Sequence, residues 1–376
     1  MTHVGIDIEQ FVRDPYGTGI QRVLQYLALE WPQDGPTAQF VAPHRDGHLL
    51  LTPEQVAPIL GVPFAGLPGD VRANVQMALA AAEGPVVPPG TLLSLFHTWL
   101  LPEVTYQPEI LARARMFAAC MPLAMIGYDA LPMTHPENYR FPPGTAARVS
   151  EYFRLLATAD AVVCISDFAR ASLWDRLRRD RSRTTTVAHP GGDHVIVEHP
   201  RAQTSNQPMI LRVGTLEARK LPLETVDACR AMADQGWQGR MVLIGRPSAS
   251  DPAINAAVDA AANAGIGLTW IQDASDDDVQ HHLSDASLFL SLGTEGYGIP
   301  VLEALGRGVP VVYDGIQPAA ELMDGKGASR IDSRDTHTLA RGLIDACRQR
   351  DVLASAIDPT AIPTWRDFVR GVVSAL

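Results

Sequence analysis

Two carboxylates, Glu295 and Glu303, flank a turn that could bind a ligand carrying both hydroxyl and phosphate groups. Glycines in the turn Gly296-Tyr297-Gly298 would let the backbone approach such a ligand closely, and Pro300 suits the first turn of a helix. The start of that helix would present N–H groups and a positive dipole end to a diphosphate. The carboxylates could accept hydrogen bonds from hydroxyls. On the residues alone, a helix-dipole role for Glu303 and a solvated loop position for Glu295 remain alternatives.

A second loop carries paired cations, Arg219 and Lys220, after an apolar stretch that ends at Val213. Lysine is rare in this chain, which has only Lys220 and Lys326 among its 31 basic residues. Arginine offers a fork of donors and lysine a compact charge, so the pair suits a diphosphate. If a nucleoside diphosphate is the leaving group, fixed cations here would stabilise the transition state. An ordinary solvated charge pair is the alternative.

Three weaker candidates lie in the first half of the chain. Gly17-Thr18-Gly19 predicts a tight turn into a helix, although it lacks the GxGxxG spacing of dinucleotide-binding proteins. His97 follows the apolar run 91–96, and Asp129 follows the run 123–127. Each of these residues also fits an ordinary structural role.

Short apolar runs alternate with amphipathic segments, which predicts strands separated by helices. In the first half we expect strands at 91–96, 123–127 and 161–165, and a helix at 19–30. A polar segment at 190–207 separates the halves. In the second half we expect strands at 209–213, 240–244, 268–271, 287–292 and 310–313, and helices at 223–233, 252–264, 277–283 and 300–306.

This alternation predicts doubly wound parallel sheets, which bind ligands at the carboxyl ends of their strands. Both the Arg219 loop and the Glu295 loop directly follow expected strands. The candidate chemistry therefore falls where such a sheet would place it.

Composition limits the possible functions of the chain. A formal net charge of −11 argues against a nucleic-acid partner. No apolar run reaches the roughly 20 residues of a membrane span. The first residues do not show the basic and then apolar segments of a secretory signal. The four cysteines lack metal-binding spacing, and we interpret 276–278 (Asp-Asp-Asp) as the acidic first turn of a helix. We therefore expect no metal and no cofactor.

The segment 291–312, SLGTEGYGIPVLEALGRGVPVV, resembles the signature of the family 4 glycosyltransferases, in which two glutamates are separated by seven residues. The resemblance implies that Glu295 contacts the donor sugar and Glu303 the ribose. It also implies that the donor pocket is lined by Gly296, Tyr297, Gly298 and Ile299.

Segment 213–220 is similar to the family's Gly-Thr-Leu-Glu-x-Arg-Lys pattern, whose cations bind the diphosphate. This implies a donor site at Gly214, Arg219 and Lys220, although Leu221 replaces the usual Gly or Asn.

In the first half, the resemblance extends to three places. It implies that Gly17, Thr18 and Gly19 face the donor phosphate and the acceptor. It also implies that His97 lies near the transferred sugar. Asp129 would lie on the acceptor side, where Tyr128 replaces the family's usual histidine.

The resemblance implies an α/β chain with the GT-B fold, in which two Rossmann-like domains face each other across a cleft. The expected domains are 1–198 for the acceptor and 199–355 for the nucleotide-sugar, and 356–376 would form a C-terminal helix returning to the N-domain. The implied reaction retains the anomeric configuration and needs no protein nucleophile.

A mannosyltransferase-like, cytoplasmic enzyme of bacterial surface polysaccharide synthesis is implied, with GDP-mannose favoured over a UDP-hexose as the donor. Its acceptor would be a glycan or a lipid-linked glycan. The basic segment Arg170–Arg183 could in addition contact an anionic membrane, or be a solvated helix face. Alternative functions are a nucleotide-sugar epimerase or hydrolase of the same fold, and a non-catalytic nucleotide-sugar-binding protein.

Overall fold

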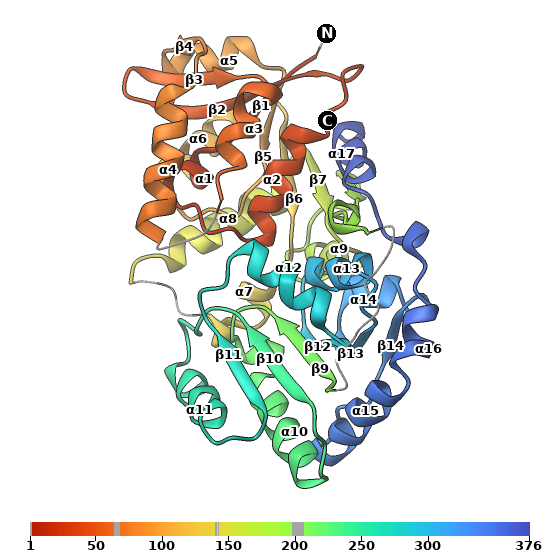
Figure 1. Cartoon of the computed structure of the whole chain (residues 1–376). Helices are drawn as coiled ribbons and strands as arrows, with labels where there is room; N and C mark the ends of the chain where they lie inside the picture. The colour runs from red at the N-terminus through yellow and green to blue at the C-terminus, as the bar shows by residue number, and fades with distance from the viewer. Residues whose placement is uncertain (1, 64–67, 140, 142, 198–206) are drawn as a thin grey trace. The chain divides into compact units, whose positions relative to one another are not determined.

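The computed structural model describes residues 2–63, 68–139, 141, 143–197 and 207–376 (Figure 1). They form two compact units. Unit 1 comprises Met1–Thr134, Phe141–Pro190 and Thr364–Leu376, and unit 2 comprises His135–Arg140 and Gly191–Pro363. The domain boundary expected between 198 and 199 lies outside the described residues.

Unit 1 contains, among its described residues, an eight-stranded sheet in the order β4-β3-β2-β1-β5-β6-β7-β8. The strands from β2 to β8 through β1 are parallel, whereas β3 and β4 add an antiparallel edge that the sequence did not predict. The strands are β1 (His3–Asp7), β2 (Thr37–His44), β3 (Gly47–Leu51), β4 (Val86–Val87), β5 (Thr98–Leu101), β6 (Leu123–Gly127), β7 (Ala161–Cys164) and β8 (Thr184–Val187).

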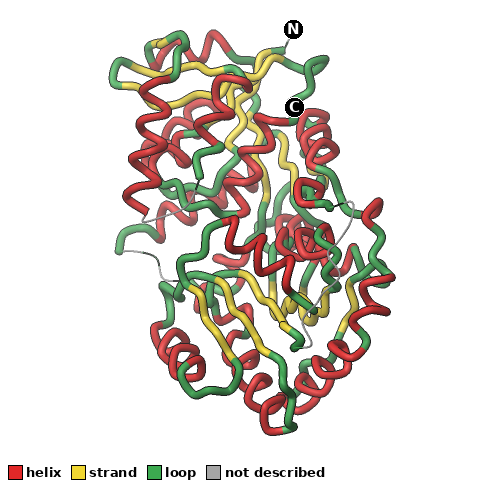
Figure 2. The backbone as a smooth tube through the Cα atoms, in the orientation of Figure 1, coloured by secondary structure: helices red, strands yellow, loops and turns green. Residues whose placement is uncertain are grey.

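The helices of unit 1 connect these strands and cover the sheet, whose strands are the yellow stretches of tube among red helices in Figure 2. Side chains cap the first turns of α2, α3, α9 and α17: the Thr18 hydroxyl, for example, accepts from Gln21 N before α2. The helices are α1 (Glu9–Arg13), α2 (Gly19–Leu29), α3 (Pro53–Leu60), α4 (Pro68–Ala81), α5 (Leu92–Leu95), α6 (Pro108–Ala118), α7 (Leu131–Thr134), α8 (Ala146–Thr158), α9 (Asp167–Asp175) and α17 (Trp365–Ser374).

Unit 2 contains a parallel sheet in the order β11-β10-β9-β12-β13-β14 over its described residues. Helices α10, α11 and α15 bury an apolar core against it that includes Leu243, Leu290 and Leu343. The strands are β9 (Met209–Val213), β10 (Arg240–Ile244), β11 (Leu268–Ile271), β12 (Leu288–Thr294), β13 (Val311–Ile316) and β14 (Ala328–Arg330). The helices are α10 (Pro222–Asp234), α11 (Pro252–Ala262), α12 (Asp276–Asp285), α13 (Ile299–Gly306), α14 (Pro318–Leu322), α15 (Thr336–Arg348) and α16 (Arg350–Ser355).

One expected strand is wrong. Residues 91–96 form the end of a short 3-10 helix and helix α5, and the strand begins only at Thr98. Short apolar runs do not distinguish a buried strand from a buried helix by periodicity. The signal that favours the helix is Pro89 in its first turn. The expected strands and helices of the second half are confirmed to within a few residues at their ends.

The last helix of the chain, α17, belongs to unit 1 and packs against α2. The Trp365 and Tyr26 rings stack with their centroids 4.2 Å apart, and Arg366 forms an ion pair with Glu30. The C-terminal helix thus returns to the N-terminal unit as expected, but it begins only at Trp365, and residues 356–363 of the expected segment belong to unit 2.

The basic segment Arg170–Arg183 is not one uniform surface. Arg179 is buried and donates to the carbonyls of Leu156, Ala157 and Ala159 and to the Thr185 hydroxyl. It therefore caps the C-terminal end of α8, where four carbonyls otherwise lack helical partners. Only part of this segment, including Arg176 and Arg178, is exposed to solvent. No described helix is both long and apolar enough to cross a bilayer.

Candidate active site

The cation pair expected in unit 2 surrounds one carboxylate. Lys220 Nζ lies 2.7 Å from Glu295 Oε1, and an Arg219 guanidinium N–H donates to Glu295 Oε2 at 2.9 Å. Arg219 also donates to Thr294 O and pairs with Glu217 at 2.5 Å. The loop after β9 and the loop after β12 thus meet at the carboxyl edge of the sheet, as the sequence predicted.

Two glycines allow these loops to approach. Gly214 has a φ of +143°, and a Cβ there would lie 2.9 Å from Lys220 Nζ. Gly293 has a φ of +87°, and its Cβ would lie 2.0 Å from Arg219 O. Side chains at either position would push the cations away from Glu295, so the geometry of the site requires glycine at both.

The electrostatics of this cluster favour the ionised carboxylate. Burial alone would raise the pKa of Glu295, but the charges of Lys220 and Arg219 and their hydrogen bonds outweigh it and lower the pKa to about 2. The pKa of Arg219 is raised in turn: burial opposes this, and the charges of Glu295 and Glu217 prevail. The two cations and two carboxylates of this Glu295 cluster, which are Arg219, Lys220, Glu217 and Glu295, therefore balance to zero charge, and any anion that entered it would have to compete with Glu295 for the cations.

The turn Gly296-Tyr297-Gly298 leads into α13 as expected. Gly298, with a φ of +109°, precedes the first helical residue, Ile299, and Tyr297 is buried. Glu303 lies inside α13 with a nearly buried side chain. Its Oε1 lies 3.1 Å from His194 Nε2, in a pair that the sequence did not predict.

In unit 1 the Gly17 loop is held by a side chain from the following helix. Gln21 Oε1 accepts from the backbone N–H groups of Tyr16 and Gly17, at 2.7 and 2.9 Å. Gln21 Nε2 donates to Asp14 O and, at 3.4 Å, to Glu103 Oε1. Gly17 has a φ of +62°, which favours glycine. The amide of Gly17 is thus engaged by Gln21, while Thr18 and Gly19 begin α2.

His97 does not lie where we expected it. It precedes β5 instead of following a strand, and its backbone N–H donates to His3 O at 2.9 Å. The His3 N–H donates to His97 Nδ1 at 3.1 Å. Because β1 and β5 are parallel and His97 adjoins the start of both, it lies at the amino edge of the sheet. The expected place of His97 beside the transferred sugar rested on a strand that ends at residue 96, and that strand is absent.

Asp129 lies just beyond the carboxyl end of β6, as expected. Its Oδ1 accepts from Leu131 N at 2.9 Å, so the carboxylate caps the short helix α7. The neighbouring Tyr128 is buried and donates its hydroxyl hydrogen to Pro102 O at 2.8 Å. The residue that replaces the family's usual histidine therefore braces the β5 and β6 ends against each other.

Glu103, which the sequence reasoning missed, occupies the carboxyl end of β5. Its side chain is buried, and Oε2 accepts from Phe11 N at 2.8 Å. Burial raises its pKa to about 8, against the lowering effect of the bonds from Gln21 and Phe11. A single Glu two residues beyond an apolar run was the only available signal.

Glu103 predicts a pH dependence of stability. Its folded pKa of about 8 lies above the ordinary unfolded value, so the folded state holds more protons between about pH 4.5 and 8 and loses stability as pH rises. We expect Glu103→Gln, which keeps an uncharged hydrogen-bonding group, to unfold at a higher urea concentration than wild type at pH 8.5 and to differ little at pH 5. Urea unfolding at both values measures this. An equal difference at the two pH values would contradict it.

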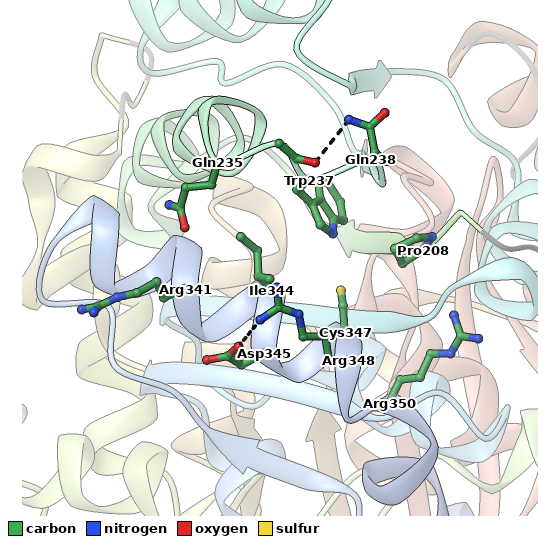
Figure 3. A pocket seen from close by; sticks show the side chains of 11 residues that line it. Pro208, Gln235, Trp237, Gln238, Arg341, Ile344, Asp345, Cys347, Arg348 and Arg350 are labelled. Carbon is green, nitrogen blue, oxygen red and sulfur yellow. Dashed lines mark hydrogen bonds and ion pairs between the residues drawn. The ribbon is translucent and has the colours of Figure 1, made fainter.

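A cavity of about 480 Å³ in unit 2 is a separate feature (Figure 3). Trp237, Ile344 and Cys347 line it together with Arg341 and Arg348. It lies where β9 and β10 begin, whereas the Glu295 cluster lies where β9 and β12 end. The cavity is therefore not part of the candidate site.

Comparison with known proteins identifies the family. The model of the family described as family 4 glycosyltransferases in conflict systems matches residues 126–357, which contain the whole Glu295 cluster. This chain is a family 4 glycosyltransferase. The expected family membership is thereby confirmed.

Two curated relatives are mannosyltransferases. A GDP-mannose-dependent α-(1-6)-phosphatidylinositol dimannoside mannosyltransferase of Mycobacterium tuberculosis is 28% identical over 192 residues, 48% of each chain. The serotype-specific mannosyltransferase WbdA of Escherichia coli is 22% identical over 338 residues, 84% of this chain and 39% of WbdA. This glycosyltransferase thus spans about half the length, or less, of the curated relatives it matches.

A solved structure confirms the fold. Anabaena HepE, determined with UDP, superposes with a TM-score of 0.65 at 16% identity, covering 100% of this glycosyltransferase and 98% of HepE. The two Rossmann-like units are those of the GT-B fold, as the sequence predicted.

Proposed function

We propose that this glycosyltransferase transfers a hexose from a nucleotide-sugar, with retention of the anomeric configuration, to a glycan or lipid-linked acceptor. The observation that carries the proposal is the placement of Glu295 between Arg219 and Lys220 at the carboxyl edge of the unit 2 sheet. A parallel sheet binds its ligand at that edge. A diphosphate needs the two cations, and a sugar needs a hydroxyl acceptor such as the ionised Glu295.

In this proposal, Arg219 and Lys220 bind the diphosphate and stabilise the charge that develops on it as the glycosidic bond breaks. Glu295 orients the sugar, and Glu303, held by His194, binds the ribose. The turn 296–298 and the start of α13 approach the phosphates through the backbone. A phosphate oxygen of the donor takes the proton of the acceptor hydroxyl, which attacks the sugar on the same face from which the diphosphate departs. No residue of this chain therefore serves as a nucleophile.

We further propose GDP-mannose as the donor, because the mycobacterial relative is GDP-mannose-dependent and WbdA is also a mannosyltransferase. UDP-hexoses are the next candidates. We also propose that the enzyme acts on the cytoplasmic side of a membrane, in the assembly of bacterial surface polysaccharide.

A thermal-shift panel with GDP, UDP, ADP and TDP tests the donor. A nucleotide present at 100 times its Kd stabilises the fold by about 2.7 kcal/mol, which raises the Tm measurably. GDP should shift the wild type most, and incubation with GDP-mannose and mannose-containing acceptors should give a glycoside. A Tm shift with UDP alone would favour a UDP-hexose over GDP-mannose as the donor. Release of free mannose without any glycoside would indicate a hydrolase. No Tm shift with any of the nucleotides would contradict the proposal.

The basic segment of α9 and the following loop remains a proposed membrane contact, now restricted to its exposed arginines. We expect Arg176→Ser combined with Arg178→Ser to weaken binding to phosphatidylglycerol vesicles in a sedimentation assay, because each exposed cation contributes about 1 kcal/mol near an anionic surface. Arg45→Ser combined with Arg154→Ser removes two exposed charges elsewhere in unit 1 and serves as the control. Equal binding by both double variants would contradict a specific contact.

A further inference from the structure

Leu221, the residue after Lys220, has an unusual backbone conformation. Its φ and ψ are 55° and 53°, in the left-handed region that glycine and asparagine tolerate best. Proline follows at position 222 and restricts the preceding residue further. Such strained residues persist where the surroundings hold them, and they concentrate at functional sites. The loop that carries Arg219 and Lys220 therefore ends in a turn that must be held in place.

Three donors converge on the Leu221 carbonyl oxygen. Thr225 contributes its backbone N–H at 3.2 Å and its hydroxyl at 2.9 Å. The third donor is Arg212 Nη1 at 3.1 Å, which also bonds the Thr225 hydroxyl. On its other side, the Leu221 N–H donates to Ala218 O at 3.0 Å. The two peptide groups that flank Leu221 are thus both held by hydrogen bonds, one through its N–H and the other through its carbonyl.

Arg212 is an unusual residue for its place. It is the next-to-last residue of the parallel strand β9, and its side chain is buried. In the part of the chain that the structure describes, no carboxylate forms an ion pair with it. Burial lowers its pKa to about 10, so it remains charged at neutral pH. A buried charge is costly unless it is compensated, and the hydrogen bonds to the Leu221 carbonyl and the Thr225 hydroxyl supply compensation here.

We propose that Arg212 is a positioning residue for the diphosphate site: its guanidinium holds the Leu221 carbonyl and so keeps Leu221 left-handed, which places Lys220 and Arg219 around Glu295. The inference deepens the proposed function, since the cations that it positions are those assigned to the donor diphosphate. It assigns a role to a buried strand residue. Among the residues that the structure describes, Arg212 forms no ion pair with Glu295 or with the turn 296–298.

Position 221 gives a direct test, because this chain has leucine where the family usually has glycine or asparagine. If Arg212 acts through the backbone of Leu221, Arg212→Met should free this turn, and Leu221→Gly should restore it in the same chain, because glycine adopts a positive φ readily. If Arg212 acted only as a third positive charge, the glycine would restore nothing. Arg212→Met keeps an unbranched apolar side chain in the core, and Thr225→Val removes one of the other donors as a second variant.

Hydrogen exchange measured on the protein without nucleotide tests the positioning itself. We expect the amides of 218–221 to exchange at least about tenfold faster in Arg212→Met, and to return to within about threefold of wild type in Arg212→Met/Leu221→Gly. Amides of β10 and β11 report whether the unit 2 core has loosened and should change little. Unchanged exchange at 218–221 in Arg212→Met, or no recovery with Leu221→Gly, overturns the proposal.

Titration with GDP and UDP tests the consequence for binding. Because a charge-assisted hydrogen bond is lost, Arg212→Met should bind the nucleotide that wild type prefers about tenfold more weakly. The double variant should recover the wild-type affinity. A nucleotide that binds Arg212→Met as tightly as wild type overturns the proposed role. If wild type binds neither nucleotide, the proposed function fails, while the exchange measurement still decides whether Arg212 holds the turn.

Discussion

Lys220→Ala should lower the kcat of sugar transfer by about 10²- to 10³-fold, corresponding to about 2.7–4 kcal/mol of lost transition-state stabilisation. The ammonium lies 2.7 Å from Glu295 and has a largely buried side chain, so solvent screens its charge little. Negative charge would develop on a departing diphosphate as the glycosidic bond breaks, so it would be greater in the transition state than in the bound donor. The effect should therefore be larger on kcat than on the KM for the donor, which steady-state kinetics with GDP-mannose separates.

The chain offers a matched control for this variant, because it has only one other lysine. Lys326 is exposed in the turn before β14 of the same unit. Lys326→Ala removes an identical charge from unit 2 and should leave kcat and KM unchanged within about twofold. A similar loss in both variants, or a Lys220→Ala enzyme with wild-type kcat, would contradict the role assigned to Lys220.

Much of unit 2 could be predicted from the sequence, because its strands and helices follow the alternation of a parallel sheet with few exceptions. The place of both loops at the carboxyl edge also followed, whereas the pairing of Glu295 with Arg219 and Lys220 depends on β9 and β12 being neighbours, which only the structure shows. Gly214 and Gly293 permit the close approach of the two loops, and both glycines can be read from the sequence. Their necessity appears only when the atoms that they face are known.

Side-chain networks between distant residues were not predictable in the same way. Arg212 is a cation inside an otherwise apolar strand, and only the fold shows that it reaches Leu221 and Thr225. His194 pairs with Glu303 across 109 positions, and no local pattern announces it. The His97 error had a different cause: a short apolar run was interpreted as a strand, which moved the histidine to the wrong edge of the sheet.

Glu295→Gln should change turnover and product binding in opposite directions. The neutral amide is a poorer acceptor for sugar hydroxyls, so we expect kcat to fall by about 100-fold. The same substitution removes a negative charge that lies within 3 Å of both Lys220 and Arg219 and competes with the diphosphate. We therefore expect free GDP to bind about tenfold more tightly, a gain of about 1.4 kcal/mol, measurable by calorimetry.

The pH profile gives the same assignment an independent check. With a pKa of about 2, Glu295 stays ionised from pH 5 to 9, so its titration should not appear in the kcat profile over that range. Since this pKa is lowered on folding, the stabilising ion pairs are complete above about pH 4.5 and are lost only as pH falls towards 2. A rise of kcat with an apparent pKa of 5 to 6 would therefore have to come from another group.

Glu217→Gln separates the two effects predicted for Glu295. Glu217 pairs with the same arginine at 2.5 Å, so its neutralisation should also tighten GDP binding, but no sugar contact is assigned to it. We expect its single-turnover rate to stay within about fivefold of wild type, while that of Glu295→Gln falls about 100-fold. If both variants lost turnover equally, Glu295 would act only by balancing the charge of the cations. If Glu295→Gln bound GDP more weakly than wild type, the carboxylate would not compete with the diphosphate at all.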